Sequence, residues 1–105
     1  KLESLTDKLL HYKIFNNLKR KVSLSLLETN HEILIVPQVT LSVGTKKGTK
    51  PSFSQAATPE VGEKLFEEFK ELLEKKFGAT ASGKFGANMS VNLTNEGPIT
   101  FWFEL

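Results

Sequence analysis

The sequence predicts a single α+β domain with the element order αββαββ. Its 105 residues are enough for one compact domain and too few for two. Apolar residues recur at spacings of three and four over residues 4–15 and 58–77, which is typical of amphipathic helices. Four other segments are continuously apolar or alternate between apolar and polar residues, which is typical of strands. Such a thin domain would gain from additional strands or from a dimer partner.

The first half of the chain contains the first helix and two of the strands. Leu5, Leu9 and Phe15 lie on one face of the expected helix over residues 4–15. Residues 16–21 are polar and basic and indicate a turn. Leucine and valine then alternate with serine over residues 22–26, which favours a short strand.

Residues 32–43 contain the most informative strand pattern. Residues 33–36 are apolar on both faces, as in a strand that is buried on both sides. Residues 38–43 then alternate strictly, so that Gln38 and Thr40 share one polar face. Pro37 separates the two patterns and cannot donate a ladder hydrogen bond, which implies a bulge, a sheet edge or a break at that point.

The second helix has clear signals at both ends. Residues 44–57 are expected to form a long loop, and Thr58 is a good N-cap before Pro59 at the first helical position. Lys75 and Lys76 suit the C-terminal turn of this helix, where positive charge complements the helix dipole, and Gly78 suits the position after that turn. Two final strands are expected over residues 91–94 and 99–105, where apolar and polar residues alternate again.

Composition excludes several classes of protein and site. There are no cysteines, so disulfides and thiolate metal sites are ruled out. The longest apolar run, residues 33–37, is far shorter than the ~20 residues of a membrane span. No stretch resembles a signal peptide, so a cytoplasmic protein without membrane attachment is the default expectation.

Charge gives one candidate binding segment. The net charge of +2 is too small to predict nucleic-acid binding, but residues 45–51 contain three lysines and no acid. Lys46, Lys47 and Lys50 are compatible with a solvated loop or with a loop that contacts phosphates.

Few residues offer catalytic chemistry. His11 and His31 are isolated, and Asp7 is the only aspartate, so a Ser-His-Asp triad has little support. No ligand cluster is present, and we expect neither a metal nor another cofactor. The polar pair Gln38 and Thr40 remains, with an exposed strand face as the alternative reading. The Gly97-Pro98 dipeptide also remains, with an ordinary turn as the alternative.

Five segments acquire meaning together because they match one set of motifs in the same order. They are residues 12–15 (YKIF), 37–41 (PQVTL), 47–53 (KGTKPSF), 85–89 (FGANM) and 95–100 (NEGPIT). They resemble the (L/Y)RIF, SQFTL, KGxxPxF, FGAxM and NxGPVT motifs of D-aminoacyl-tRNA deacylases. Any single match is weak, but the five together extend over nearly the whole chain. The sequence is identified as a member of this family.

The resemblance implies an α+β homodimer with a curved β-sheet and two helices, in which residues 1–105 form one incomplete deacylase domain. It also implies a site at the dimer interface, where Gln38 and Thr40 from one subunit are catalytic. By the same resemblance, Gly97-Pro98 of the other subunit would cross over with a cis peptide bond and would exclude an L side chain by collision. The substrate is the ester that joins a D-amino acid, or glycine on tRNA-Ala, to the terminal adenosine of tRNA.

The same resemblance assigns further residues. Lys46, Lys47 and Lys50 would bind tRNA, and backbone N–H groups near Val39 and Thr40 would hold the oxyanion. The Thr40 hydroxyl is either a nucleophile or a positioning group, and participation of the RNA's own 2′-hydroxyl is the preferred alternative. The residues that would contact the substrate are Val39, Leu41, Phe85, Gly86, Ala87, Met89, Asn95, Gly97 and Pro98.

Three departures from the family pattern leave alternatives open. Pro37 replaces the usual serine and is similar to the PQATL motif of a paralogue that removes L-alanine from mischarged tRNA. Val39 replaces phenylalanine, and the family's first strands, about 40 residues, have no counterpart before Lys1. The rival functions are that paralogue's activity, a non-catalytic nucleic-acid-binding dimer, and an editing module of a larger synthetase.

Overall fold

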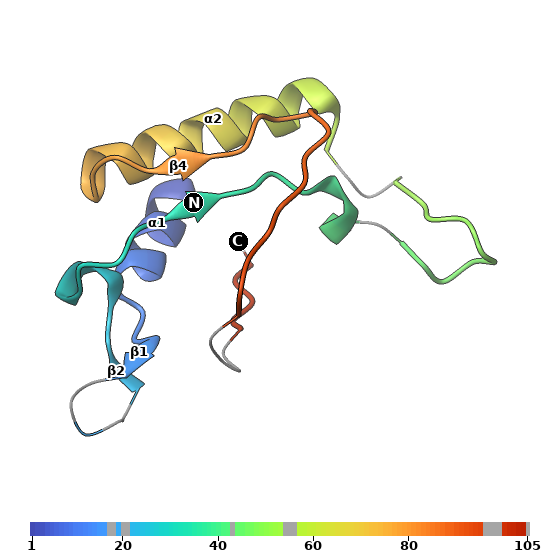
Figure 1. Ribbon diagram of the computed structural model, residues 1–105. Coiled ribbons are helices and arrows are strands. Elements are labelled where there is room, and N and C mark those ends of the chain that lie inside the picture. Colours follow the sequence, from blue (N-terminus) through green and yellow to red (C-terminus); the bar gives the residue numbers. More distant parts are fainter. Residues whose placement is uncertain (17–18, 20–21, 43, 54–56, 96–99, 105) are drawn as a thin grey trace.

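The computed structural model describes residues 1–16, 19, 22–42, 44–53, 57–95 and 100–104 (Figure 1). Two helices and several short strands are present, which confirms the α+β class. In chain order the elements are α1 (Leu2–His11), β1 (Phe15–Asn16), β2 (Val22–Leu24), the 3₁₀ turn η1 (Leu26–Glu28), β3 (Leu34–Ile35), the 3₁₀ turn η2 (Val39–Ser42), α2 (Pro59–Lys76) and β4 (Ala81–Ser82).

Helix α2 begins and ends as the sequence predicts. The hydroxyl of Thr58 accepts a hydrogen bond from the N–H of Val61 at 3.4 Å, and Pro59 occupies the first turn. Lysines stand in the last turn, where they complement the helix dipole. Gly78 follows with φ of 130°, a backbone conformation that residues other than glycine rarely adopt.

Helix α1 is shorter than predicted because the chain enters a hairpin. Tyr12 is already extended, and the N–H of Ile14 donates to the carbonyl of Leu24 at 3.0 Å. Phe15, assigned to the helix from its spacing, instead pairs with Leu24 in the antiparallel β1–β2 sheet. Pairing with a strand farther along the chain thus overrides the local helical period.

Strands β3 and β4 form a parallel pair that is connected through helix α2. Leu34 lies opposite Ala81 and Ile35 opposite Ser82. The pairing continues on both sides, because Ala81 N–H donates to Ile33 O at 3.1 Å and Gly83 N–H donates to Ile35 O at 2.8 Å. The sequence did not predict β4. The sheets are two separate two-stranded pairs among the described residues, rather than one curved sheet.

Three predicted strand segments are wrong in the described part of the chain. Residues 39–42 form a 3₁₀ turn, in which Leu41 N–H donates to Gln38 O at 3.3 Å. Residues 91–94 and 100–104 form no strand, and Figure 1 draws them without a strand arrow. Alternation alone does not make a strand, because its backbone groups need a neighbouring strand to pair with.

The hydrophobic core is small and draws on four different elements. Its buried residues are Leu10 of α1, Leu26 of η1, Ile35 of β3 and Leu73 of α2. Outside the core, Lys76 of α2 donates to Asp7 at 2.7 Å and to Glu3 at 3.1 Å on α1. Because Leu10, Leu73 and Ile35 share one core, both helices pack with β3, whose continuation contributes to the candidate site.

A capping box stabilises η1 and connects it to the residues before β1. The Glu28 carboxylate accepts hydrogen bonds from Ser25 N–H at 3.0 Å, from the Ser25 hydroxyl at 2.9 Å and from the Lys13 ammonium. The Lys13 hydrogen bond, followed by those from Ser25, lowers the pKa of Glu28 from 4.5 to about 2.

This shift predicts a specific acid sensitivity. Because the pKa is lower in the folded chain, the carboxylate stabilises the fold fully above pH 4.5, and this stabilisation is lost as the pH falls toward 2. The stability difference between the wild type and Glu28→Gln should therefore be largest near neutral pH and shrink below 4.5. Urea unfolding followed by circular dichroism at several pH values measures it, with Glu32→Gln as the matched control. An unchanged difference down to pH 2 would contradict the role of this carboxylate.

Candidate active site

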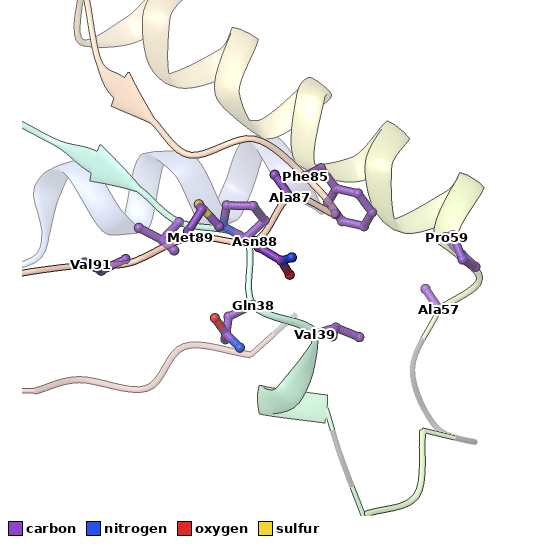
Figure 2. A pocket seen from close by; sticks show the side chains of 12 residues that line it. Gln38, Val39, Ala57, Pro59, Phe85, Ala87, Asn88, Met89 and Val91 are labelled. Carbon is purple, nitrogen blue, oxygen red and sulfur yellow. The ribbon is translucent and has the colours of Figure 1, made fainter.

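A cavity of about 490 Å³ lies where the continuations of β3 and β4 separate (Figure 2). Because the two strands are parallel, both chains leave the sheet at the same end, which is where α/β proteins commonly form clefts. The beginning of α2 supplies the remaining side. The described lining residues are Val36, Pro37, Gln38, Val39, Ala57, Pro59, Phe85, Gly86, Ala87, Asn88, Met89 and Val91.

The cavity brings together much of the predicted site. Gln38 and Val39 come from the segment after β3, and Phe85, Gly86, Ala87 and Met89 come from the segment after β4. The second segment turns sharply, because Ala87 N–H donates to Lys84 O at 3.2 Å and Gly86 has φ of 77°. Residues far apart in sequence thus form one wall.

Other predicted residues lie elsewhere. Thr40 and Leu41 follow Val39 in η2 but do not line the cavity, and neither does Asn95. Lys46, Lys47 and Lys50 are exposed on the loop, which an isolated bridge between Gly44 and Ser52 closes. Gly97 and Pro98 fall outside the described residues.

Gln38 and Thr40 form a direct pair despite the absence of the predicted strand. The Gln38 side-chain amide, immediately before η2, donates to the hydroxyl oxygen of Thr40 in η2 at 2.5 Å. The oxygen thereby accepts a hydrogen bond and keeps its own proton available for donation. No described histidine or carboxylate is hydrogen-bonded to Thr40 to remove that proton. The geometry favours a positioned donor over an activated nucleophile.

One wall of the cavity is apolar and supported from α2. The Phe85 ring lies 6.2 Å from the Phe66 ring, centroid to centroid. Met89 completes this wall beside Pro37. The face suits a flat, largely apolar group such as a nucleobase, and Gln38 and Asn88 provide amides at its border.

Sequence reasoning missed six lining residues: Val36, Pro37, Ala57, Pro59, Asn88 and Val91. Pro37 and Asn88 lie inside the recognised motifs 37–41 and 85–89, so motif membership alone could have identified them as lining residues. Figure 2 shows the Asn88 amide between its own segment and Gln38. Ala57 and Pro59 enter only through the approach of α2, which no local pattern indicates.

None of the described lining residues is ionisable. The described part of the chain also has no group of three or more histidines and carboxylates arranged to hold a metal ion. The described lining side chains therefore offer shape and two amide groups, with no acid–base group of their own.

A family model described as D-Tyr-tRNA(Tyr) deacylase matches residues 1–104. The chain belongs to the D-aminoacyl-tRNA deacylase family. This confirms the family that the five motifs indicate. Curated relatives agree over almost the same extent of the chain. A D-aminoacyl-tRNA deacylase of Hydrogenovibrio crunogenus is 47% identical over 107 residues, covering 98% of this chain and 72% of that protein.

A second curated relative agrees with this membership, and a solved structure shares the fold. A D-aminoacyl-tRNA deacylase of Histophilus somni is 45% identical over 105 residues, covering 100% of this chain and 72% of its own length. A solved structure named c-Myc DNA Unwinding Element Binding Protein superimposes with a TM-score of 0.83 at 36% identity, over 94% of this chain and 68% of that one. In the described residues, no helix is long and apolar enough to cross a membrane.

Proposed function

We propose that this protein hydrolyses the ester bond of D-aminoacyl-tRNA, and of glycine mischarged onto tRNA-Ala, in the cytoplasm as translation quality control. The observation that carries the proposal is that residues 37–39 of one family motif and residues 85–89 of another line the same cavity. Its volume of about 490 Å³ suits a terminal nucleoside and a small amino acid.

The cavity's chemistry is compatible with this reaction because an aminoacyl ester is already activated. Water adds to the ester carbonyl, and the bond to the ribose oxygen breaks. One proton of the water passes to the ribose oxygen, which becomes a hydroxyl, and the other passes to solvent, so the amino acid leaves as a free carboxylate. The N–H groups of Val39 and Thr40 begin η2, so the turn itself does not use them, and they are available to an oxyanion. The 2′-hydroxyl of the RNA supplies the proton-transfer group that the described lining lacks.

We further propose a homodimer in which Gly97 and Pro98 of a second subunit complete the site. Large apolar residues are exposed on the described C-terminal segment, including Leu93 at 73% and Trp102 at 66%. Such exposure favours a surface that a second subunit covers. A backbone wall without a Cβ would reject an L side chain by collision and would let glycine pass.

Thr40 is expected to act through its hydroxyl proton. Thr40→Val, which is nearly isosteric, should reduce kcat for D-Tyr-tRNA by about 10- to 100-fold, as expected when a hydrogen bond to a developing charge is lost. Thr40→Ser keeps the hydroxyl and the Gln38 hydrogen bond, and should retain most activity. Single-turnover deacylation rates measure both. A fully active Thr40→Val protein would exclude the hydroxyl from the reaction.

The lysine loop is expected to contribute affinity for tRNA and not chemistry. Replacing Lys46, Lys47 and Lys50 together by alanine should weaken tRNA binding and reduce the slope of log K against log salt by about 2 to 3. Replacing Lys64, Lys70 and Lys75 on α2 removes the same charge and is the matched control. Fluorescence anisotropy at several salt concentrations measures the slope, and equal effects of both triple variants would contradict a specific loop contact.

A substrate panel tests the function itself. The full-length protein should deacylate D-Tyr-tRNA and Gly-tRNA and leave L-Tyr-tRNA intact. Pro37 lines the cavity and matches the first residue of the PQATL motif in the L-alanine-acting paralogue. Rapid hydrolysis of L-Ala-tRNA with no hydrolysis of D-Tyr-tRNA would favour that paralogue's activity. The solved neighbour's name refers to DNA binding. Binding of nucleic acid without hydrolysis of any ester would favour a non-catalytic module.

A further inference from the structure

Gly83 lies immediately after β4 and is held in place by its backbone. Its N–H donates to the carbonyl of Ile35 at 2.8 Å, so it extends the β3–β4 pairing by one residue. It does not line the 490 Å³ cavity. Its φ is outside the left-handed region, so any requirement for glycine here concerns space and not backbone conformation.

The space beside Gly83 is already occupied by two residues of the cavity wall. A Cβ added to Gly83 would lie 2.5 Å from Met89 Sδ, 3.2 Å from Met89 Cε and 3.3 Å from Pro37 Cδ. The first separation is shorter than any carbon–sulfur contact that a packed protein tolerates. The Pro37 ring is rigid, whereas Met89 has three rotatable bonds, so Met89 is the group that would move.

Met89 lies between two hollows on the surface. It lines the cavity described above, and it also lines a groove of about 290 Å³ to which Gly83 belongs. Val36 and Val91 line both hollows as well, so Met89 is one of three described residues in the wall that they share. Displacement of Met89 by a methyl group at position 83 would change the shape of the wall to which Pro37 also belongs.

We propose that Gly83 is a positioning residue, which sets the cavity wall by letting Met89 lie against β4 and beside Pro37. The residue acts only through its neighbours and touches no substrate. The proposal deepens the deacylase function proposed above, and its kinetic consequences rest on that function. Its structural consequence, the place of Met89, can be measured independently of any activity.

The single methionine in the 105-residue sequence makes that measurement direct. With ¹³C-methyl methionine, the Met89 methyl group is assigned by its disappearance in Met89→Ala. Gly83→Ala should shift this methyl resonance strongly. Gly44→Ala is the matched control, because a Cβ at Gly44 would meet its nearest described atoms at ordinary distances of 3.6 and 3.7 Å. Gly44→Ala should leave the Met89 signal unchanged.

The kinetic test uses the full-length protein and D-Tyr-tRNA. Gly83→Ala should raise KM about tenfold with a smaller effect on kcat, as expected for an overpacked binding wall. Met89→Ala removes the colliding side chain, so adding Gly83→Ala to that background should change KM by less than about twofold. Thermal unfolding of each variant shows whether it is folded.

Each result decides the proposal. A shifted Met89 signal with non-additive KM effects supports it, as does a Gly83→Ala protein that unfolds but is restored by Met89→Ala. An unshifted signal, equal additive effects in both backgrounds, or failure of the double variant to fold while Met89→Ala folds would overturn it. A shifted signal in a protein whose wild type hydrolyses none of the esters would support the positioning role and reject the proposed function.

Discussion

The parallel pairing of β3 and β4 is the constraint on which the candidate site depends. Only two residues of each strand are paired, but the hydrogen bonds from Ala81 and Gly83 lengthen the contact in both directions. This short ladder fixes the register between residues 36–39 and 83–91, which together form most of the cavity wall. A shift in this register would change which residues of the two segments face each other across the cavity.

Helix α2 makes that pairing possible and is also the element that the sequence predicts best. Its 18 residues repeat the helical period many times, and Thr58, Pro59 and Gly78 signal both ends through local chemistry. The helix carries the chain from the end of the loop back toward β3, so that a strand placed after Gly78 runs parallel to β3. Leu73, which is 1% exposed, holds the helix on the core that also contains Ile35.

The strands show where sequence reasoning stops. Strand β4 has two residues, Ala81 and Ser82, and neither its length nor its composition distinguishes it from a loop. Residues 91–94 and 100–104 have the alternation of strands, yet lack a strand partner among the described residues. Phe15 fits a helical face and nevertheless pairs with Leu24. In each case the outcome depends on a neighbour remote in sequence, which a local period does not contain.

The part of the candidate site that the sequence predicted is the part that lies within recognised motifs. Gln38, Val39 and the 85–89 segment were found by resemblance, and the structure brings them together, whereas the expected strand face of Gln38 and Thr40 became a turn with a direct hydrogen bond. In the proposed reaction the turn would provide a hydroxyl proton and the N–H groups of its first two residues, beside a described lining without charge. Such a site has little power to activate a poor leaving group. Under the proposed function the bond is reactive before it binds, and discrimination between substrates would then depend on the shape of the wall. For that reason the packing of uncharged residues such as Gly83, Met89 and Pro37 has a direct bearing on the proposed chemistry.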